Sequence, residues 1–147
     1  MDRRRFLLLG AVLTVGMLVG PTLKPSFGAS KLEEEVKKRV GVDLATIKES
    51  GDVKLTVPTI AESGANVPVT VETDIPADKI QHLWIFVDNN PLPWILDVKV
   101  TPQNGKFWFS TRIKMGQTSN VRAIFKLADG SYVMATKEVK VTAGGCG

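Results

Sequence analysis

Apolar and polar positions follow two different periods along this chain. From residue 53 onward, short runs rich in Val, Ile, Thr and aromatic residues are separated by Gly, Pro, Asn and Asp, a texture typical of an all-β sandwich. The runs predict seven strands, at residues 53–57, 67–73, 80–87, 95–101, 106–113, 119–127 and 132–141. Seven strands suffice for an immunoglobulin-like fold, so we predict a mainly β, antiparallel sandwich over residues 51–141.

The turn-forming residues between the runs predict how the strands connect. Two dipeptides, Asn104-Gly105 and Asp129-Gly130, indicate hairpins, because type I′ turns need positive φ at both central residues. The segment VDNNPLPWI indicates a rigid loop, with two prolines fixing φ and with Asn89 and Asn90 bonding their own backbone. The chain shows no internal repeat and no sign of a second domain.

Residues 30–50 have a helical period instead. Leu32, Val36 and Val40 lie four residues apart, and three glutamates precede a basic run, an order that suits the helix dipole. Ser30 is the candidate N-cap and Gly41 the candidate C-terminal residue, with a second short turn in 43–49. The charged face indicates a solvated helix surface, which we favour, or a docking helix.

Residues 1–29 have the pattern of an export signal. A basic start is followed by an apolar stretch over 6–20 and by small residues near 26–29, and the stretch is too short to span a bilayer. Arg3 and Arg4, with the residues after them, fit a twin-arginine signal, and a general secretory signal is the alternative. We therefore expect export by the twin-arginine pathway to a periplasm, and no membrane association after the signal is removed.

The predicted signal also holds most of the net charge. The chain carries +4, and residues 1–29 contain four basic residues and one acidic residue. The remaining chain is nearly neutral, so its charge gives no reason to expect nucleic acid or an anionic membrane as a partner.

Few residues outside the C-terminus offer chemistry. His82 is the only histidine, and a strand histidine with a satisfied hydrogen bond is a simpler interpretation than a general base or a metal ligand. Trp84, Trp94 and Trp108 are most simply core or interface aromatics. We find no phosphate-binding loop, nucleophile elbow, dinucleotide fingerprint or zinc-binding cysteine pair, so a hydrolase or metalloprotein is disfavoured and no cofactor or metal is expected.

The only cysteine, Cys146, lies in the C-terminal sequence GGCG. Gly144, Gly145 and Gly147 give backbone freedom, and an arm over 142–147 can extend roughly 20 Å. A thiol on such an arm lacks the fixed neighbours that catalysis needs, and it suits carrying a covalent group to other proteins. An intermolecular disulfide and an accidental terminal cysteine are the alternatives.

Several segments together resemble the SoxY family, the sulfur-carrier subunits of the periplasmic thiosulfate-oxidising Sox system. They are GGCG, the preceding TRIKMGQTSNVRAIFKLADGSYVMATKEVKVTA, VDNNPLP and IAESGANVPVTV, together with the twin-arginine pattern. The resemblance implies an immunoglobulin-type sandwich whose arm cysteine, here Cys146, is conjugated to thiosulfate by a c-type cytochrome enzyme. It also implies a SoxZ-like β-sandwich partner in a heterodimer, a sulfate-releasing hydrolase, and further Sox enzymes that process the remaining sulfur. The family pattern ends in Gly-Gly-Cys-Gly-Gly, whereas this sequence ends one glycine earlier.

Two functions from different classes follow. The first is a covalent sulfur carrier that is not itself an enzyme, with Cys146 as the attachment residue. The second is an exported β-sandwich interaction module whose Cys146 forms a structural disulfide, including a disulfide-linked dimer. For either function, we expect exposed apolar residues within 80–87 and 121–127 to contribute to a partner interface.

Overall fold

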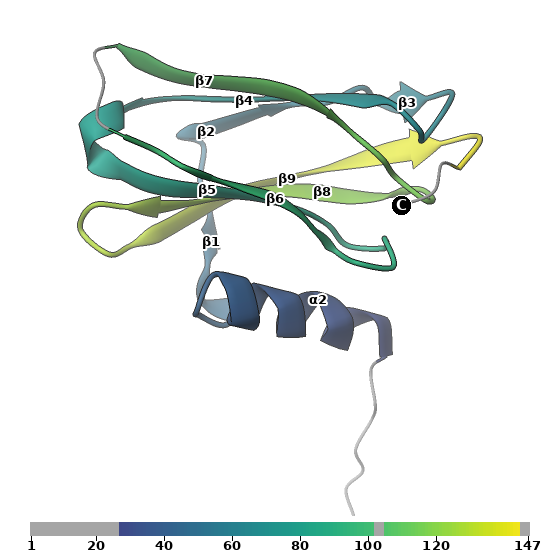
Figure 1. Ribbon diagram of the computed structural model, residues 1–147, viewed down its shortest axis with the longest axis horizontal. Coiled ribbons are helices and arrows are strands. Elements are labelled where there is room, and N and C mark those ends of the chain that lie inside the picture. Colours follow the sequence, from purple (N-terminus) through teal and green to yellow (C-terminus); the bar gives the residue numbers. More distant parts are fainter. Residues whose placement is uncertain (1–26, 102–104, 145–147) are drawn as a thin grey trace, which may run out of the picture.

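The protein is two β-sheets packed face to face, with one helix on the outer face of the larger sheet (Figure 1). The structure is a computed structural model, and it describes residues 27–101 and 105–144, with side chains from residue 31 onward. The six-stranded sheet is formed by β1 (Lys48–Glu49), β3 (Ile60–Ala61), β5 (Ile80–Val87), β6 (Trp94–Lys99), β8 (Ser119–Leu127) and β9 (Tyr132–Val141). The three-stranded sheet is formed by β2 (Val53–Thr56), β4 (Val67–Pro76) and β7 (Lys106–Ile113). The remaining elements are the helix α2 (Phe27–Arg39) and the 3-10 turns η2 (Leu44–Thr46) and η3 (Ala77–Lys79).

The predicted mainly β sandwich and all seven predicted strands are confirmed. The strand order is β1-β9-β8-β5-β6 in the larger sheet, with β3 also on β9, and β2-β4-β7 in the smaller. Two strands, β1 and β3, were not predicted; each has two residues and pairs parallel to β9, so neither leaves a periodic pattern in the sequence. The sandwich is therefore antiparallel except along one strand.

The core between the sheets follows from strict alternation on β4. Val67, Val69 and Val71 are fully buried, while the residues between them face outward. Strand β5 is buried on both faces, because its other side lies under α2; this explains its unbroken apolar run from Leu83 to Val87.

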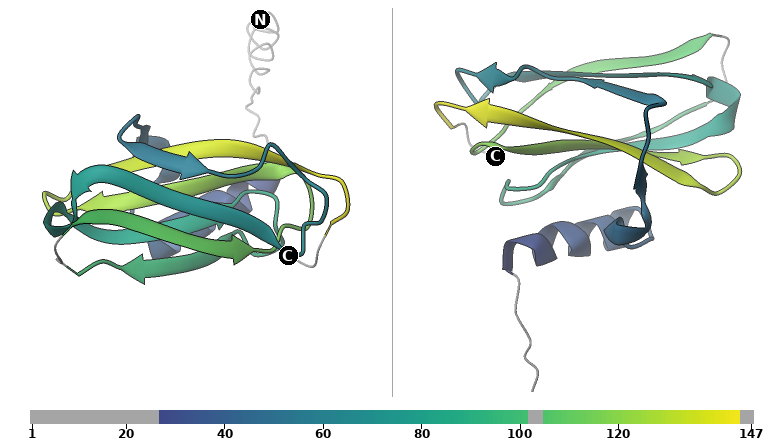
Figure 2. Two further views of the ribbon diagram at one scale, coloured as in Figure 1. Left: turned by 90° about the horizontal axis from the view of Figure 1, so that it is seen from above. Right: turned by 180° about the vertical axis from the view of Figure 1, so that it is seen from behind.

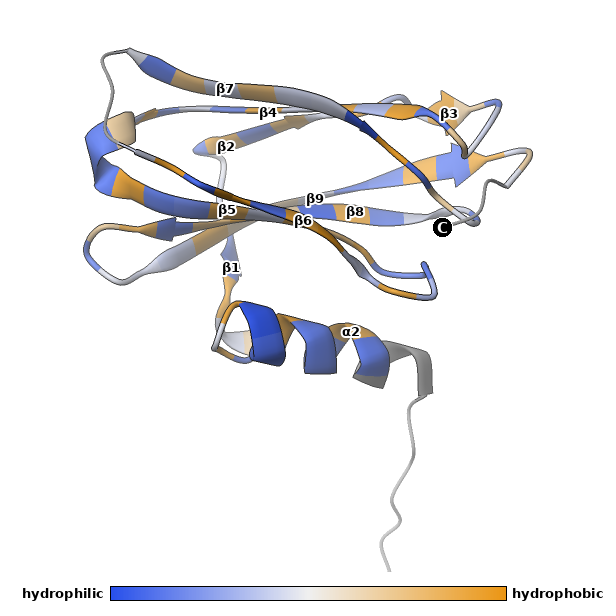
Figure 3. Ribbon diagram, in the orientation of Figure 1, coloured by the Kyte–Doolittle hydropathy of each residue, from blue (hydrophilic) through white to orange (hydrophobic). Residues whose placement is uncertain are grey.

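The helix α2 packs on the larger sheet through the predicted apolar stripe. Leu32, Val36 and Val40 are buried against a patch of the sheet formed by Trp84, Phe86, Ile124 and Met134. The glutamates and lysines of the opposite face are mostly exposed, as a solvated helix surface requires, and Figure 3 shows the polar and apolar bands along α2.

Only one of the two predicted helix ends is correct. Gly41 has φ +96° and donates its N–H to the carbonyl of Lys37, which is typical of a C-terminal glycine. The N-cap prediction is wrong, because α2 begins at Phe27 and Ser30 is already inside it.

Both hairpin predictions need correction. β6 pairs with β5 and β7 pairs with β4, so the connection through Gly105 crosses from one sheet to the other instead of forming a hairpin. The β8–β9 hairpin is real, but only Gly130 has positive φ, so the turn is not type I′. The Gly130 N–H bonds the Leu127 carbonyl at 3.0 Å and the Leu127 N–H bonds the Ser131 carbonyl at 2.8 Å, which makes a three-residue loop with glycine in its last position.

The predicted interface strands are not exposed. Most side chains of β5 and of 121–125 in β8 are buried, either in the core or under α2. The prediction is wrong because apolar runs in a central strand reflect burial on two faces, which sequence alone does not distinguish from an exposed patch.

Candidate functional site

The chain leaves the sandwich at the end of β9, beside the loops that close this end of the two sheets (Figures 1 and 2). We call the described residues that follow β9, 142–144, the arm root. The predicted attachment residue Cys146 lies outside the described residues, as do Gly145 and Gly147.

The arm root is hydrogen-bonded to the end of β3 and to the residues that follow it. The Thr142 N–H donates to the carbonyl of Ala61 at 3.1 Å, and the Thr142 hydroxyl donates to the carbonyl of Glu62 at 3.0 Å. The Gly64 N–H donates to the carbonyl of Ala143 at 2.7 Å. The predicted arm of 142–147 therefore begins with two residues that are bonded to the sandwich.

This anchoring changes the reach expected from the sequence. Two peptide steps separate Gly144 from Cys146, a backbone span of at most about 7 Å, compared with roughly 17 Å over the five steps from Val141 to Cys146 in an arm that is free from residue 142.

A second loop, 114–118, supports the arm root from the other side, and we call it the platform. The Thr118 hydroxyl oxygen accepts the Val141 N–H at 2.9 Å, and the Met115 N–H donates to the carbonyl of Gly64 at 2.7 Å. A Cβ at Gly144 would collide with the carbonyl oxygen of Gly116, so the backbones of root and platform are in close contact there. Flexibility was the role predicted for Gly144, and close backbone approach is a further one.

Asn90 holds the platform in place, a role that the sequence analysis missed. Its side chain is 5% exposed; the amide nitrogen donates to the carbonyl of Lys114 at 2.9 Å, and the amide oxygen accepts the Gly116 N–H at 2.9 Å. Asn89, by contrast, is exposed and donates its amide to the carbonyl of Thr118 at 3.0 Å. Both asparagines thus bond a distant loop and not their own backbone, which corrects the prediction.

The segments that the sequence analysis singled out meet at this end of the molecule. IAESGANVPVTV supplies the residues that bond the arm root, VDNNPLP supplies Asn90, and the KMGQT stretch forms the platform. These segments lie dozens of residues apart in the sequence, so sequence reasoning did not predict that they are close together in the fold.

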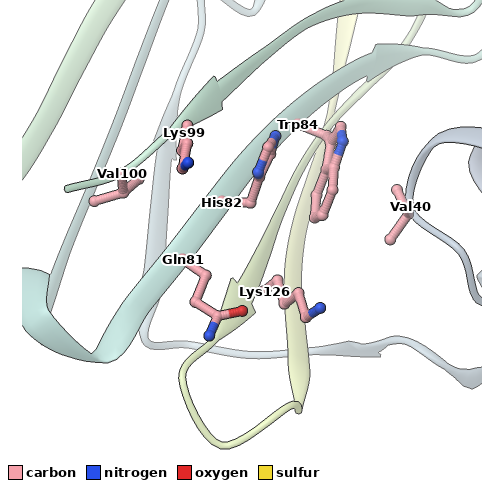
Figure 4. Close-up of a pocket in the computed structure, with 7 residues that line it drawn as sticks. All are labelled: Val40, Gln81, His82, Trp84, Lys99, Val100 and Lys126. Carbon is pink, nitrogen blue, oxygen red and sulfur yellow. The ribbon is translucent and has the colours of Figure 1, made fainter.

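His82 is confirmed as a hydrogen-bonded strand residue. Its Nε2 lies 3.1 Å from Oδ2 of Asp97, and its ring stacks on Trp84 with centroids 4.4 Å apart. It lines an open pocket of about 380 Å³ together with Lys99 and Lys126 (Figure 4). His82 lies near the start of β5 and Asn90 follows its end, so this pocket is separate from the arm root.

The three tryptophans differ in burial, and only the core role is confirmed, for Trp84. Trp84 is buried, and Trp94 is partly buried with the guanidinium of Arg39 3.7 Å from its ring centroid. Trp108 is 63% exposed on β7, at the outer face of the smaller sheet.

Among residues 27–101 and 105–144, no three His, Cys, Asp or Glu side chains lie close enough together to hold a metal ion. In the same ranges, no helix has the length and apolar character needed to cross a bilayer.

Comparison with known proteins identifies relatives of this architecture. The family model described as sulfur oxidation protein SoxY matches residues 37–146, a range that includes the cysteine. The structure is similar to the sulfur carrier protein SoxY from Chlorobium limicola f thiosulfatophilum, with 35% identity, a TM-score of 0.64, and coverage of 78% of this chain and 98% of that one.

More distant structures share the fold alone. A superoxide reductase (neelaredoxin) from Ignicoccus hospitalis aligns with 17% identity, a TM-score of 0.54, and coverage of 80% of this chain and 99% of that one. A putative superoxide reductase from Thermotoga maritima aligns with 12% identity, a TM-score of 0.51, and coverage of 68% and 98%. No curated protein sequence matches the chain.

Proposed function

Because this chain belongs to the SoxY family of sulfur-oxidation proteins, we propose that it is a sulfur carrier whose cargo is attached to the thiol of Cys146. The observation that supports this most strongly is the extent of the family match, which runs through residue 146 and so includes the single cysteine of the chain. The anchored arm root supports it further, since the chain is hydrogen-bonded at one end of the sandwich through Thr142 and Ala143, shortly before the cysteine in the sequence.

The proposed loading step joins the thiol to thiosulfate. The Cys146 thiol loses its proton, its sulfur forms an S–S bond with the terminal sulfur of thiosulfate, and two electrons leave to the c-type cytochrome enzyme that conjugates them. The product is a cysteine S-thiosulfonate. A hydrolase then adds water at the sulfonate sulfur, which releases sulfate and leaves a sulfane sulfur on Cys146 for later enzymes.

This assignment makes the protein a substrate scaffold and not an enzyme. Its partners are a SoxZ-like β-sandwich subunit, the conjugating cytochrome enzyme, the hydrolase and the enzymes that process the sulfane sulfur. The proposed location is the periplasm, reached through the twin-arginine signal of residues 1–29; a pathway that exports folded proteins would also carry a bound partner that lacks a signal.

Intact-mass spectrometry of protein purified from its native cells tests the carrier function. We expect an increment of S₂O₃ or of sulfur on the C-terminal peptide after growth with thiosulfate, removed by reductant and absent from Cys146→Ser. A plain thiol under all growth conditions, or only a disulfide to another chain, would contradict the carrier function and favour the disulfide-forming module.

A further inference from the structure

The contacts around the arm root point to a device that sets where the arm leaves the sandwich. We propose that the platform, locked by Asn90, fixes the position of the arm root, and that residue 144 must be glycine because its Cα lies against the platform backbone. The importance of this positioning for cargo delivery rests on the proposed function. The contacts themselves do not depend on it.

The platform is held rigidly on the side away from the arm. Buried Asn90 uses both its donor and its acceptor on the backbone of the platform, at Lys114 and Gly116. The loop that carries Asn90 also includes Asp88, which fixes it. The guanidinium of Arg122 donates hydrogen bonds to both carboxylate oxygens of Asp88, at 2.8 and 2.9 Å. A buried amide with both partners satisfied specifies one loop conformation, since any other leaves polar groups unpaired.

The platform is connected to the arm root in three places, and only the contact between Gly116 and Gly144 is direct. Its Thr118 hydroxyl accepts the last N–H of β9, and the carbonyl of Gly116 lies where a Cβ of residue 144 would stand. Its Met115 N–H bonds Gly64, whose own N–H bonds Ala143. One small loop thus positions both sides of the arm root.

The two glycines before the cysteine therefore have different roles. Any side chain at 144 would force the root away from Gly116 and break its bond with Gly64, whereas Gly145 has the flexibility role that the sequence predicts. With the root in place, a partner enzyme must bring its reacting group within about 7 Å of backbone span from Gly144. The carrier thus offers its cargo close to one end of the sandwich.

Amide hydrogen exchange of the full chain, followed by NMR, tests the positioning role. In Gly144→Ala we expect the Gly64 and Thr142 amides to exchange at least about tenfold faster, because their partners move, with no change at Val69 in the core. Gly51→Ala is the matched control: Gly51 lacks positive φ, and a Cβ there meets no atom within 4 Å. Gly145→Ala controls for loss of chain flexibility.

The Asn90 side of the device has its own readout. We expect Asn90→Ala to accelerate exchange at Gly116 and Val141 more than at Val69, and a nitroxide attached to Cys146 to gain mobility in the same variant. Uniform acceleration of all amides would show that Asn90 supports the whole fold and not the arm, and it would overturn the positioning role.

Two results would overturn the inference at Gly144. The first is Gly64 exchange in Gly144→Ala that is no faster than in Gly145→Ala, and the second is equal acceleration at Val69. The carrier function is tested separately. An intact platform without a sulfur adduct on Cys146 would refute the proposed function alone. A sulfur adduct together with unchanged Gly64 exchange in Gly144→Ala would refute the positioning role of the platform alone.

Discussion

Asn89 and Asn90 are adjacent residues of the same type, but the fold places them in different environments. Asn89 is exposed, whereas Asn90 is buried with both ends of its amide bonded to the backbone more than twenty residues away. Sequence reasoning predicted a rigid loop here, and the structure has a loop between β5 and β6, but the prediction assigned both side chains to local bonds. The difference depends on which loop lies opposite, and no local pattern encodes that.

Asp129 offers a test at the same scale, in the β8–β9 turn. Its carboxylate accepts the hydroxyl of Ser131 at 2.6 Å and the Ser131 N–H at 2.9 Å, and these bonds hold the pKa of Asp129 below its ordinary value, the hydroxyl contributing most. Ser131→Ala should raise this pKa toward the ordinary value, measured by carbon NMR titration. Ser110→Ala, a change on a different strand, should not move it.

The depressed pKa of Asp129 makes its contribution to stability depend on pH. Because the folded pKa of Asp129 is depressed, its carboxylate adds stability above the unfolded pKa of about 3.9, and this contribution disappears as pH falls through the folded pKa. Any stability difference between wild type and Ser131→Ala that comes from this charge should therefore vanish in acid. A difference that persists below both pKa values would contradict the assignment.

At the scale of elements, α2 serves as the cover of the larger sheet. Its apolar stripe seals the outer face of β5 and β8, which otherwise would expose a large aromatic and aliphatic patch. The stripe was readable in the sequence because its period matches the helix, and the seven long strands were readable for the same kind of reason. The face that α2 covers could not be predicted, because β5 has no apolar–polar alternation when both of its faces are buried.

Truncation of the helix stripe gives a quantitative prediction. Val36 is fully buried, so Val36→Ala should lower the free energy of unfolding by about 2 kcal/mol through lost burial and the cavity left behind. Glu34→Ala on the exposed face should change it by less than about 0.5 kcal/mol. Urea unfolding measures both, and equal effects would show that α2 does not pack as described.

The limits of the sequence analysis are also clearest for short elements. β1 and β3 contribute two residues each and pair with a strand more than seventy residues away, so neither has a period to detect. The same holds for the arm root, whose anchoring by Ala61, Glu62 and Gly64 depends on the fold alone. The arm and its cysteine could be recognised in the sequence because of their glycine-rich composition. The residues that bond the arm root could not.

At the scale of the whole molecule, the proposed cargo position follows the residues that build the sandwich. Among the described residues, both hydrophobic clusters are formed within 32–141. We expect a bulky maleimide on Cys146 to change the free energy of unfolding by less than about 0.5 kcal/mol. Denaturant titration of labelled and unlabelled protein measures this, and a loss above about 1 kcal/mol would mean that the thiol region stabilises the fold.

The placement of the arm on β9 has a mechanical consequence. β9 is bonded along one side to β8 in antiparallel register and along the other to β1 and β3 in parallel register. When a partner holds the cargo and pulls along the chain, the load runs into a strand with neighbours on both sides, so several hydrogen bonds must shear together before the strand yields. The same pull on an edge strand would be resisted by the bonds of one side alone. In the proposed carrier role, a pull on the C-terminal end is therefore resisted by a strand that has neighbours on both sides.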